Sequence, residues 1–178
     1  MTESRNEITL LRKFLFELSD TKHLIEISRG KYDFGPVCGV VRKLDRSLVY
    51  VQLYDGTGLL DIMTVFFLPH VETVASMPDR TKMLLEENSN FLDVFQTLPD
   101  FKLNTIWNVA QWAQNRFKAV ELYFEGIHHD ITAKGKIIEQ DLDYVLVQEY
   151  DEKGKIPKGK KLFERKFITR LEFGDIYR

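Results

Sequence analysis

The sequence predicts a mostly β, α+β protein with two five-stranded small barrels, each preceded by a helix, and a connecting helix that joins them. Three observations lead to this fold class. One motif occurs twice along the 178 residues, each copy follows a stretch with helical periodicity, and each copy divides into about five short strand-like segments. A motif repeated at this spacing indicates one small fold built twice.

The repeat places residues 39–74 over residues 135–170 without a gap, so that each residue lies over the one ninety-six positions later. Ten of the thirty-six aligned pairs are identical, whereas unrelated segments of ordinary composition would share about two or three. The identical pairs are Gly39/Gly135, Asp45/Asp141, Val49/Val145, Val51/Val147, Gln52/Gln148, Tyr54/Tyr150, Asp55/Asp151, Gly58/Gly154, Phe67/Phe163 and Thr73/Thr169.

The first half begins with a predicted helix over about residues 5–19. Ser4 and Glu7 have the spacing of a capping box, and Leu11, Leu15 and Leu18 recur on one helical face. Alternating or apolar runs then predict strands at about 23–28, 37–41, 47–54, 63–68 and 71–74. The run 47–54 alternates most regularly, and the Asp-Gly-Thr-Gly sequence that follows it favours a turn.

The second half repeats this order. Asn104 can cap a helix over about 105–118, and strands are expected at about 120–124, 131–138, 144–150, 161–163 and 167–171. Between the halves, Pro78-Asp79 begins a further helical stretch that extends to about residue 98. The predicted organisation is therefore a first unit at 1–78, a connecting helix and loop at 79–103, and a second unit at 104–178.

Closed barrels are expected because five short strands are too few for two good sheets. A strand that closes the barrel also leaves no unpaired edge. Gly39 and Gly135 lie within the second predicted strand of each unit, where glycine permits sharp bending.

A glycine and an aspartate six residues apart, Gly39 with Asp45 and Gly135 with Asp141, follow a helix and one strand in both halves. In this the chain resembles the Sm-like (LSm) family of SH3-like small barrels, over roughly residues 8–74 and 104–171. The resemblance implies ring assembly through pairing of the fourth and fifth strands, and binding of single-stranded RNA by many members. The sequence departs from the family at Val49 and Val145, where an RNA-contacting asparagine is usual. The Arg-Gly or Lys-Gly pair of the family's second motif is also absent from the fifth-strand regions, which read Leu68-Pro-His-Val71 and Glu164-Arg-Lys-Phe167.

The bulk composition is that of an ordinary globular protein, with a formal net charge of −2 and a pI near 6.1. This charge disfavours a strongly basic nucleic-acid-binding protein. No run approaches the roughly 18 apolar residues of a membrane span, and the charged start MTESRNE does not resemble a secretory signal. The single cysteine, Cys38, cannot form an internal disulfide. We therefore expect a cytoplasmic protein that has no membrane partner.

The segment Lys153 to Lys166 is the most strongly basic segment of the chain. Its candidate nucleic-acid contacts are Lys155, Lys158, Lys160, Lys161, Arg165 and Lys166. Such a cluster can neutralise phosphates, but a lysine-rich strand edge that prevents aggregation explains the same residues.

The segment 59–68 is the most apolar in the chain. A strand buried by the first barrel and the connecting helix explains it, and so does an exposed assembly edge. The candidate edge residues are Ile62, Val65, Phe66 and Phe67.

No catalytic motif is present, and His128-His129-Asp130 lacks further ligands at zinc spacing. Cys38 is expected to be a small core residue. We expect no cofactor, no metal and no enzymatic activity. The sequence favours a non-enzymatic binding or assembly module that acts through protein–protein contact or self-association. The alternative is a single-stranded RNA binder that uses the basic turn of the second unit.

Overall fold

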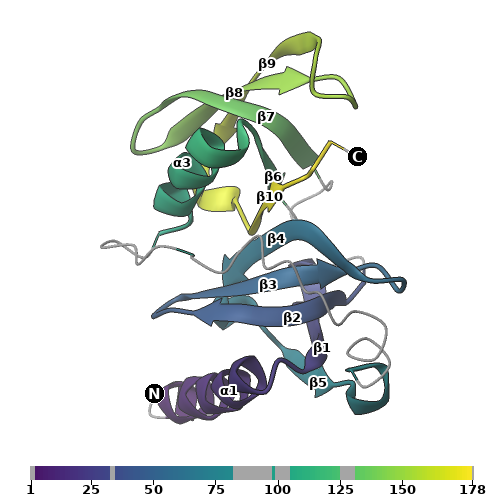
Figure 1. Cartoon of the computed structure of the whole chain (residues 1–178). Coiled ribbons are helices and arrows are strands. Elements are labelled where there is room, and N and C mark those ends of the chain that lie inside the picture. The colour runs from purple at the N-terminus through teal and green to yellow at the C-terminus, as the bar shows by residue number, and fades with distance from the viewer. Residues whose placement is uncertain (1–2, 33–34, 82–97, 99–104, 125–130, 178) are drawn as a thin grey trace.

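The structure, a computed structural model, describes residues 3–32, 35–81, 98, 105–124 and 131–177. Across these ranges ten strands form one antiparallel sheet in the order β5-β1-β2-β3-β4-β10-β6-β7-β8-β9. Figure 1 shows the two halves stacked, with β4 and β10 side by side where they meet.

The first half follows the helix α1 (Glu3–Asp20). Its strands are β1 (Leu24–Ser28), β2 (Val37–Leu44), β3 (Leu48–Tyr54), β4 (Leu59–Phe67) and β5 (Thr73–Ser76). Short 3-10 turns lie at Gly30–Tyr32 and Leu68–His70. The second turn begins where Pro69 lacks the N–H that a continued strand would need.

The second half follows the helix α3 (Ile106–Phe117). The Thr105 side chain caps its start by accepting from the Asn108 N–H, and Lys118 ends it in a left-handed conformation at φ 70°. Its strands are β6 (Val120–Phe124), β7 (Ile131–Gln140), β8 (Tyr144–Tyr150), β9 (Pro157–Glu164) and β10 (Arg170–Gly174), with a 3-10 turn at Arg165–Phe167.

The strand registers of the two halves match closely. In β2–β3, Gly39 lies opposite Leu53, and in β7–β8 Gly135 lies opposite Glu149, with a bulge at the same place in both ladders. The residue numbers of equivalent positions differ by ninety-six here, as the ungapped alignment predicts.

This difference changes by one residue on either side of β2 and β3. After the turn that follows β3 it becomes ninety-seven, because Val49 lies opposite Phe66 while Val145 lies opposite Phe163. Before Gly39 it is ninety-five, because Gly39 lies opposite Ile25 and Gly135 opposite Val120.

Among the described residues there are three buried apolar clusters, and the two larger ones join the helices to the sheet. One lies within the first half, where Leu15 and Leu18 of α1 pack with Ile25, Ile27 and neighbouring strand residues. The other joins Met63 and Val65 of β4 with residues of α3, β6 and β10. Arg29 is fully buried and also crosses between the halves, since its Nη1 donates to the Thr169 carbonyl at 3.2 Å.

The prediction of two closed five-stranded barrels with a connecting helix is wrong. In the described residues, neither set of five strands closes on itself, and the fourth strand of the first half pairs with the fifth strand of the second. The alternation of apolar residues identifies the buried face of a strand, but it does not identify the strand on either side of it. Most of the predicted connecting helix lies outside the described residues, and the unit boundaries at 78 and 104 stay predictions.

Among the described residues, none of the helices combines the length and the apolar character that crossing a membrane requires.

Candidate functional site

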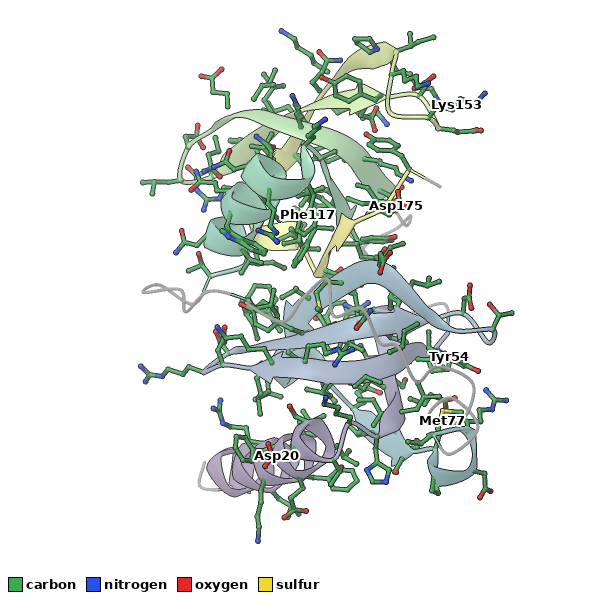
Figure 2. All side chains as sticks on the ribbon, viewed as in Figure 1. Asp20, Tyr54, Met77, Phe117, Lys153 and Asp175 are labelled. Carbon is green, nitrogen blue, oxygen red and sulfur yellow. The ribbon has the colours of Figure 1, made fainter. Side chains whose placement is uncertain are left out.

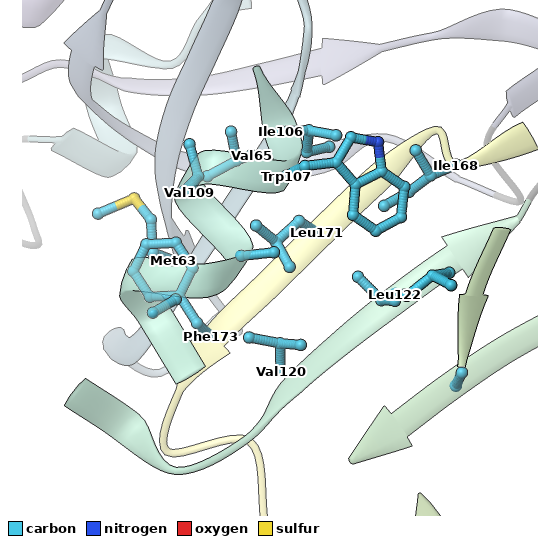
Figure 3. Packing of buried hydrophobic residues seen from close by; sticks show 14 of the residues in the cluster. Met63, Val65, Ile106, Trp107, Val109, Val120, Leu122, Ile168, Leu171 and Phe173 are labelled. Atoms are coloured by element: carbon cyan, nitrogen blue, oxygen red, sulfur yellow. The ribbon is translucent and has the colours of Figure 1, made fainter. Parts of the chain in front are cut away.

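The two halves meet through a strand pair that is built like an interface between two proteins. Antiparallel β4 and β10 pair over five positions, with Val65 opposite Leu171 and Met63 opposite Phe173. All four of these side chains are fully buried. Figure 3 shows them in the same cluster as Ile106 and Val109 of α3. This seam therefore combines a backbone ladder with a closely packed apolar layer.

The sheet has two edges at its far ends. Within the described ranges, β5 pairs only with β1 and β9 pairs only with β8. By its place in the strand order, β9 is the counterpart of β4, and β5 is the counterpart of β10. The two strands that would form a second seam thus lie at opposite ends of one sheet. An edge strand presents unpaired N–H and C=O groups that can pair with another strand.

The β9 edge carries the basic residues that sequence reasoning selected, together with an exposed apolar side chain. Lys158, Lys160 and Lys161 are exposed, and the Lys161 Nζ lies 2.9 Å from a Glu149 carboxylate oxygen. Leu162, on the same strand, is 62% exposed. The turn before β9, which bears the labelled Lys153 in Figure 2, carries Lys155.

The remaining two predicted nucleic-acid contacts are engaged within the protein. Arg165 donates from Nη1 to the Asp141 carbonyl, and Lys166 forms an ion pair with Glu164. Lys158 and Lys161 also share a polar hollow with Glu121, Glu149, Asp151 and Glu152. The predicted basic cluster is therefore a surface of mixed charge.

The β5 edge lies beside a groove that is mainly apolar. Its walls come from α1 and β5 and are formed by Leu10, Leu11, Lys13, Phe14, Glu17 and Val74. Leu10 is 70% exposed and Phe14 is 37% exposed. Large apolar side chains gathered beside an unpaired strand edge are typical of an interaction surface.

The predicted assembly residues all lie on β4. Val65 and Phe66 are fully buried, while Ile62 and Phe67 are partly exposed. The second half already occupies this edge, because β10 pairs with it from Ile62 to Phe66. In this chain the apolar segment therefore forms the internal seam.

The repeated aspartates of the β2–β3 and β7–β8 turns bind their own turns. Asp45 accepts hydrogen bonds from the backbone N–H groups of Ser47 and Leu48 and from the Tyr50 hydroxyl. Asp141 accepts from the N–H groups of Asp143 and Tyr144, and these two bonds lower its pKa. Their carboxylate oxygens hold the turns in place. The Val49 and Val145 side chains, at the family's asparagine position, are fully buried.

A polar network covers one face of β6 and β10. The Tyr123 hydroxyl donates to Glu172 at 3.0 Å, and Arg170 lies over the Tyr123 ring at 3.7 Å. Burial raises the pKa of Glu121, and the charge of Glu172 adds to this, whereas Lys134 opposes it. Each of these groups has a neighbour that explains its position, so the network supports the sheet.

The described residues hold no group of three or more histidine, cysteine, aspartate or glutamate side chains placed to bind a metal ion. The segment His128-His129-Asp130 lies outside the described residues. Burial raises the pKa of the Cys38 thiol, which disfavours the reactive thiolate.

Sequence reasoning did not select Phe14, Val74 or Leu162. None belongs to a chemical motif, and each becomes notable only once its neighbours along the sheet are known. The repeat contains the signal that identifies Leu162: when β9 is placed over β4 with the observed one-residue shift, Leu162 falls on Val65.

No protein-family model, no curated protein and no solved structure matches this chain.

Proposed function

We propose that the chain is a non-enzymatic assembly module that self-associates, with β9 of one copy pairing with β5 of the next. The observation that carries this proposal is the internal pairing of β4 with β10. The same two kinds of strand lie at the two ends of the described sheet, each with one unpaired edge. One end of the sheet has a fourth strand, β9, without a fifth-strand partner, and the other end has a fifth strand, β5, without a fourth-strand partner. The contact between copies is therefore head to tail and repeats from copy to copy.

Kinship with the Sm-like family forms part of the proposal. Its support is the strand order, which is β5-β1-β2-β3-β4 in the first half and the equivalent β10-β6-β7-β8-β9 in the second. Pairing between a fourth and a fifth strand, the contact that the resemblance implies between subunits, occurs here within one chain. A cytoplasmic location is also part of the proposal, with which the single free cysteine, Cys38, is compatible.

The molar mass in solution tests self-association. We expect light scattering coupled to size exclusion to give a mass of at least twice 20.9 kDa, falling as the protein is diluted. A chain that keeps the mass of a monomer at high protein concentration would contradict the proposal.

Single-stranded RNA is the second candidate partner, and the exposure of Lys158, Lys160 and Lys161 on β9 favours it. The mass measurement is therefore repeated at low salt with added single-stranded RNA. Self-association predicts a similar mass with and without RNA. An increase in mass that requires RNA, disappears at high salt and is lost on replacing the three lysines with alanine would favour RNA binding instead.

A further inference from the structure

We infer that the groove between α1 and β5 is the specificity-determining pocket of the contact between copies, and that Leu162 from β9 of a second copy fills it. This inference rests on the proposed self-association and adds the side chains that select the partner and fix the register. A backbone ladder alone accepts many strands, whereas side-chain packing selects one register.

The internal seam provides the template for the contact. Across β6, β10 and β4, Leu122, Leu171 and Val65 lie in one row of cross-strand neighbours, and all three are fully buried. Apolar neighbours that line up across strands are a main source of stability in a sheet.

The matched registers give the equivalent row at the edges. Ile27 pairs with Val74 as Leu122 pairs with Leu171, and Leu162 stands on β9 where Val65 stands on β4. Transfer of the internal pairing therefore places Leu162 of one copy opposite Val74 of the next. The same register pairs Ala75 with Lys161 and Ser76 with Lys160.

The helices complete the comparison. Leu15 and Leu18 are buried on α1, and Ala110 and Ala113 are buried on α3 with the same spacing. When these pairs are aligned, Phe14 falls on Val109. Val109 is fully buried in the cluster that contains Val65, whereas Phe14 is 37% exposed. Among the described residues, no strand covers Phe14 in the way that β4 covers Val109.

The groove fits this occupant in position and in chemistry. Phe14, Leu11 and Val74 form its apolar wall beside the unpaired edge of β5. An exposed leucine that enters it would remove apolar surface from water on both sides.

The charges on the opposite face of the β5 edge, away from the groove, also match. Glu26 pairs with Ala75 across β1 and β5, so the transferred register brings Lys161 onto the same face, beyond the short alanine side chain. The Lys161 ammonium lies near Glu149 of its own chain and has three donors, so it can engage a second carboxylate. A lysine-rich strand thus meets an edge strand whose inner neighbour, β1, carries a carboxylate, which favours β9 of a second copy as the occupant.

Disulfide trapping tests the register. Val74→Cys and Leu162→Cys are made in separate chains, each in a Cys38→Ser background and with tags of different size. Residues directly opposite in an antiparallel pair have Cβ atoms about 4.5–5.5 Å apart, close to the separation in a disulfide. We expect mixing and mild oxidation to give a covalent product of the two chains. Lys158→Cys, four residues from Leu162 on β9, replaces Leu162→Cys as the control and should give little product.

Serine substitutions test the groove. We expect Phe14→Ser and Leu162→Ser each to raise the dissociation constant of the assembly at least tenfold. Phe16→Ser, at a side chain 59% exposed on another face of α1, should change it less than twofold. Circular dichroism confirms that each variant is folded.

The outcomes separate the two proposals. A monomeric wild type, together with no covalent product from Val74→Cys and Leu162→Cys, overturns both self-association and the groove. Association of the wild type without the Val74–Leu162 product overturns the inference and leaves self-association standing. If the product forms while Phe14→Ser and Leu162→Ser bind normally, strand pairing stands and the groove has no role in selecting the partner.

Discussion

Two glycines at equivalent positions set how closely neighbouring strands approach. A methyl group on Gly39 would lie 2.1 Å from the Gln52 carbonyl oxygen, and one on Gly135 would lie 2.0 Å from the Gln148 carbonyl oxygen. The sequence indicated bending at these glycines. The structure adds that the backbone of the next strand occupies the space of a side chain, which no pattern within one strand can predict.

Replacement of either glycine by alanine should therefore destabilise the protein. We expect Gly39→Ala and Gly135→Ala each to lower the free energy of unfolding by about 1–3 kcal/mol, because the backbone has to shift. Gly58→Ala is the control, since nothing lies within 4 Å of its added methyl group, and it should change stability by less than about 0.5 kcal/mol. Urea denaturation measures all three. Equal stability of the Gly135→Ala and Gly58→Ala variants would show that the close approach is not maintained.

At the scale of the elements, the regular β3 strand and its turns were predictable because alternation and Asp-Gly chemistry act locally. The partner of β4 was not predictable in the same way. Its apolar character is the same whether it closes a barrel, lies under a helix or joins another unit, since all three environments bury the same side chains. Only the register of Val65 against Leu171 distinguishes them.

The face formed by β6 and β10 should make stability depend on pH through Glu121. Burial raises its pKa, so the folded state holds this proton more tightly than the unfolded state does. The stabilisation that protonation gives is present below the ordinary glutamate pKa and is lost as the pH rises through the pKa of the folded state.

Glu121→Gln, which is uncharged throughout, removes this dependence. We expect the variant to gain stability relative to the wild type as the pH rises from 4 to 7, measured as the difference between urea unfolding free energies. Glu139→Gln, at an exposed side chain on β7, serves as the control for the loss of a carboxylate. A difference between wild type and Glu121→Gln that stays constant over this range would contradict the burial argument.

At the scale of the molecule, the duplication was visible in the sequence, but its consequence was not. The ungapped alignment holds through β2 and β3 and is wrong by one residue on either side of them. Loops that differ in length by one residue shift the numbering between the halves but leave the strand pairing unchanged. The candidate interaction site depends on those small shifts. The equivalence of Leu162 to Val65, and of Val74 to Leu171, can be recognised only when the pairing of each strand is known.

The seam should make the two halves unfold together, and the chain has a natural probe in each half. Cys38, the only cysteine, lies on β2 of the first half, and both tryptophans, Trp107 and Trp112, lie on α3 of the second.

Leu171 is fully buried in the seam between β4 and β6. Leu171→Ala should lower stability by about 2–5 kcal/mol through the cavity that it leaves. Because β4 and β10 share one ladder and one apolar layer, we expect the urea midpoints from tryptophan fluorescence and from Cys38 labelling to fall together. Leu142→Ala, at a side chain 91% exposed, should leave both midpoints unchanged. If fluorescence shifts while Cys38 labelling does not, the halves unfold independently, and the internal seam is too weak to serve as the template for a contact between copies.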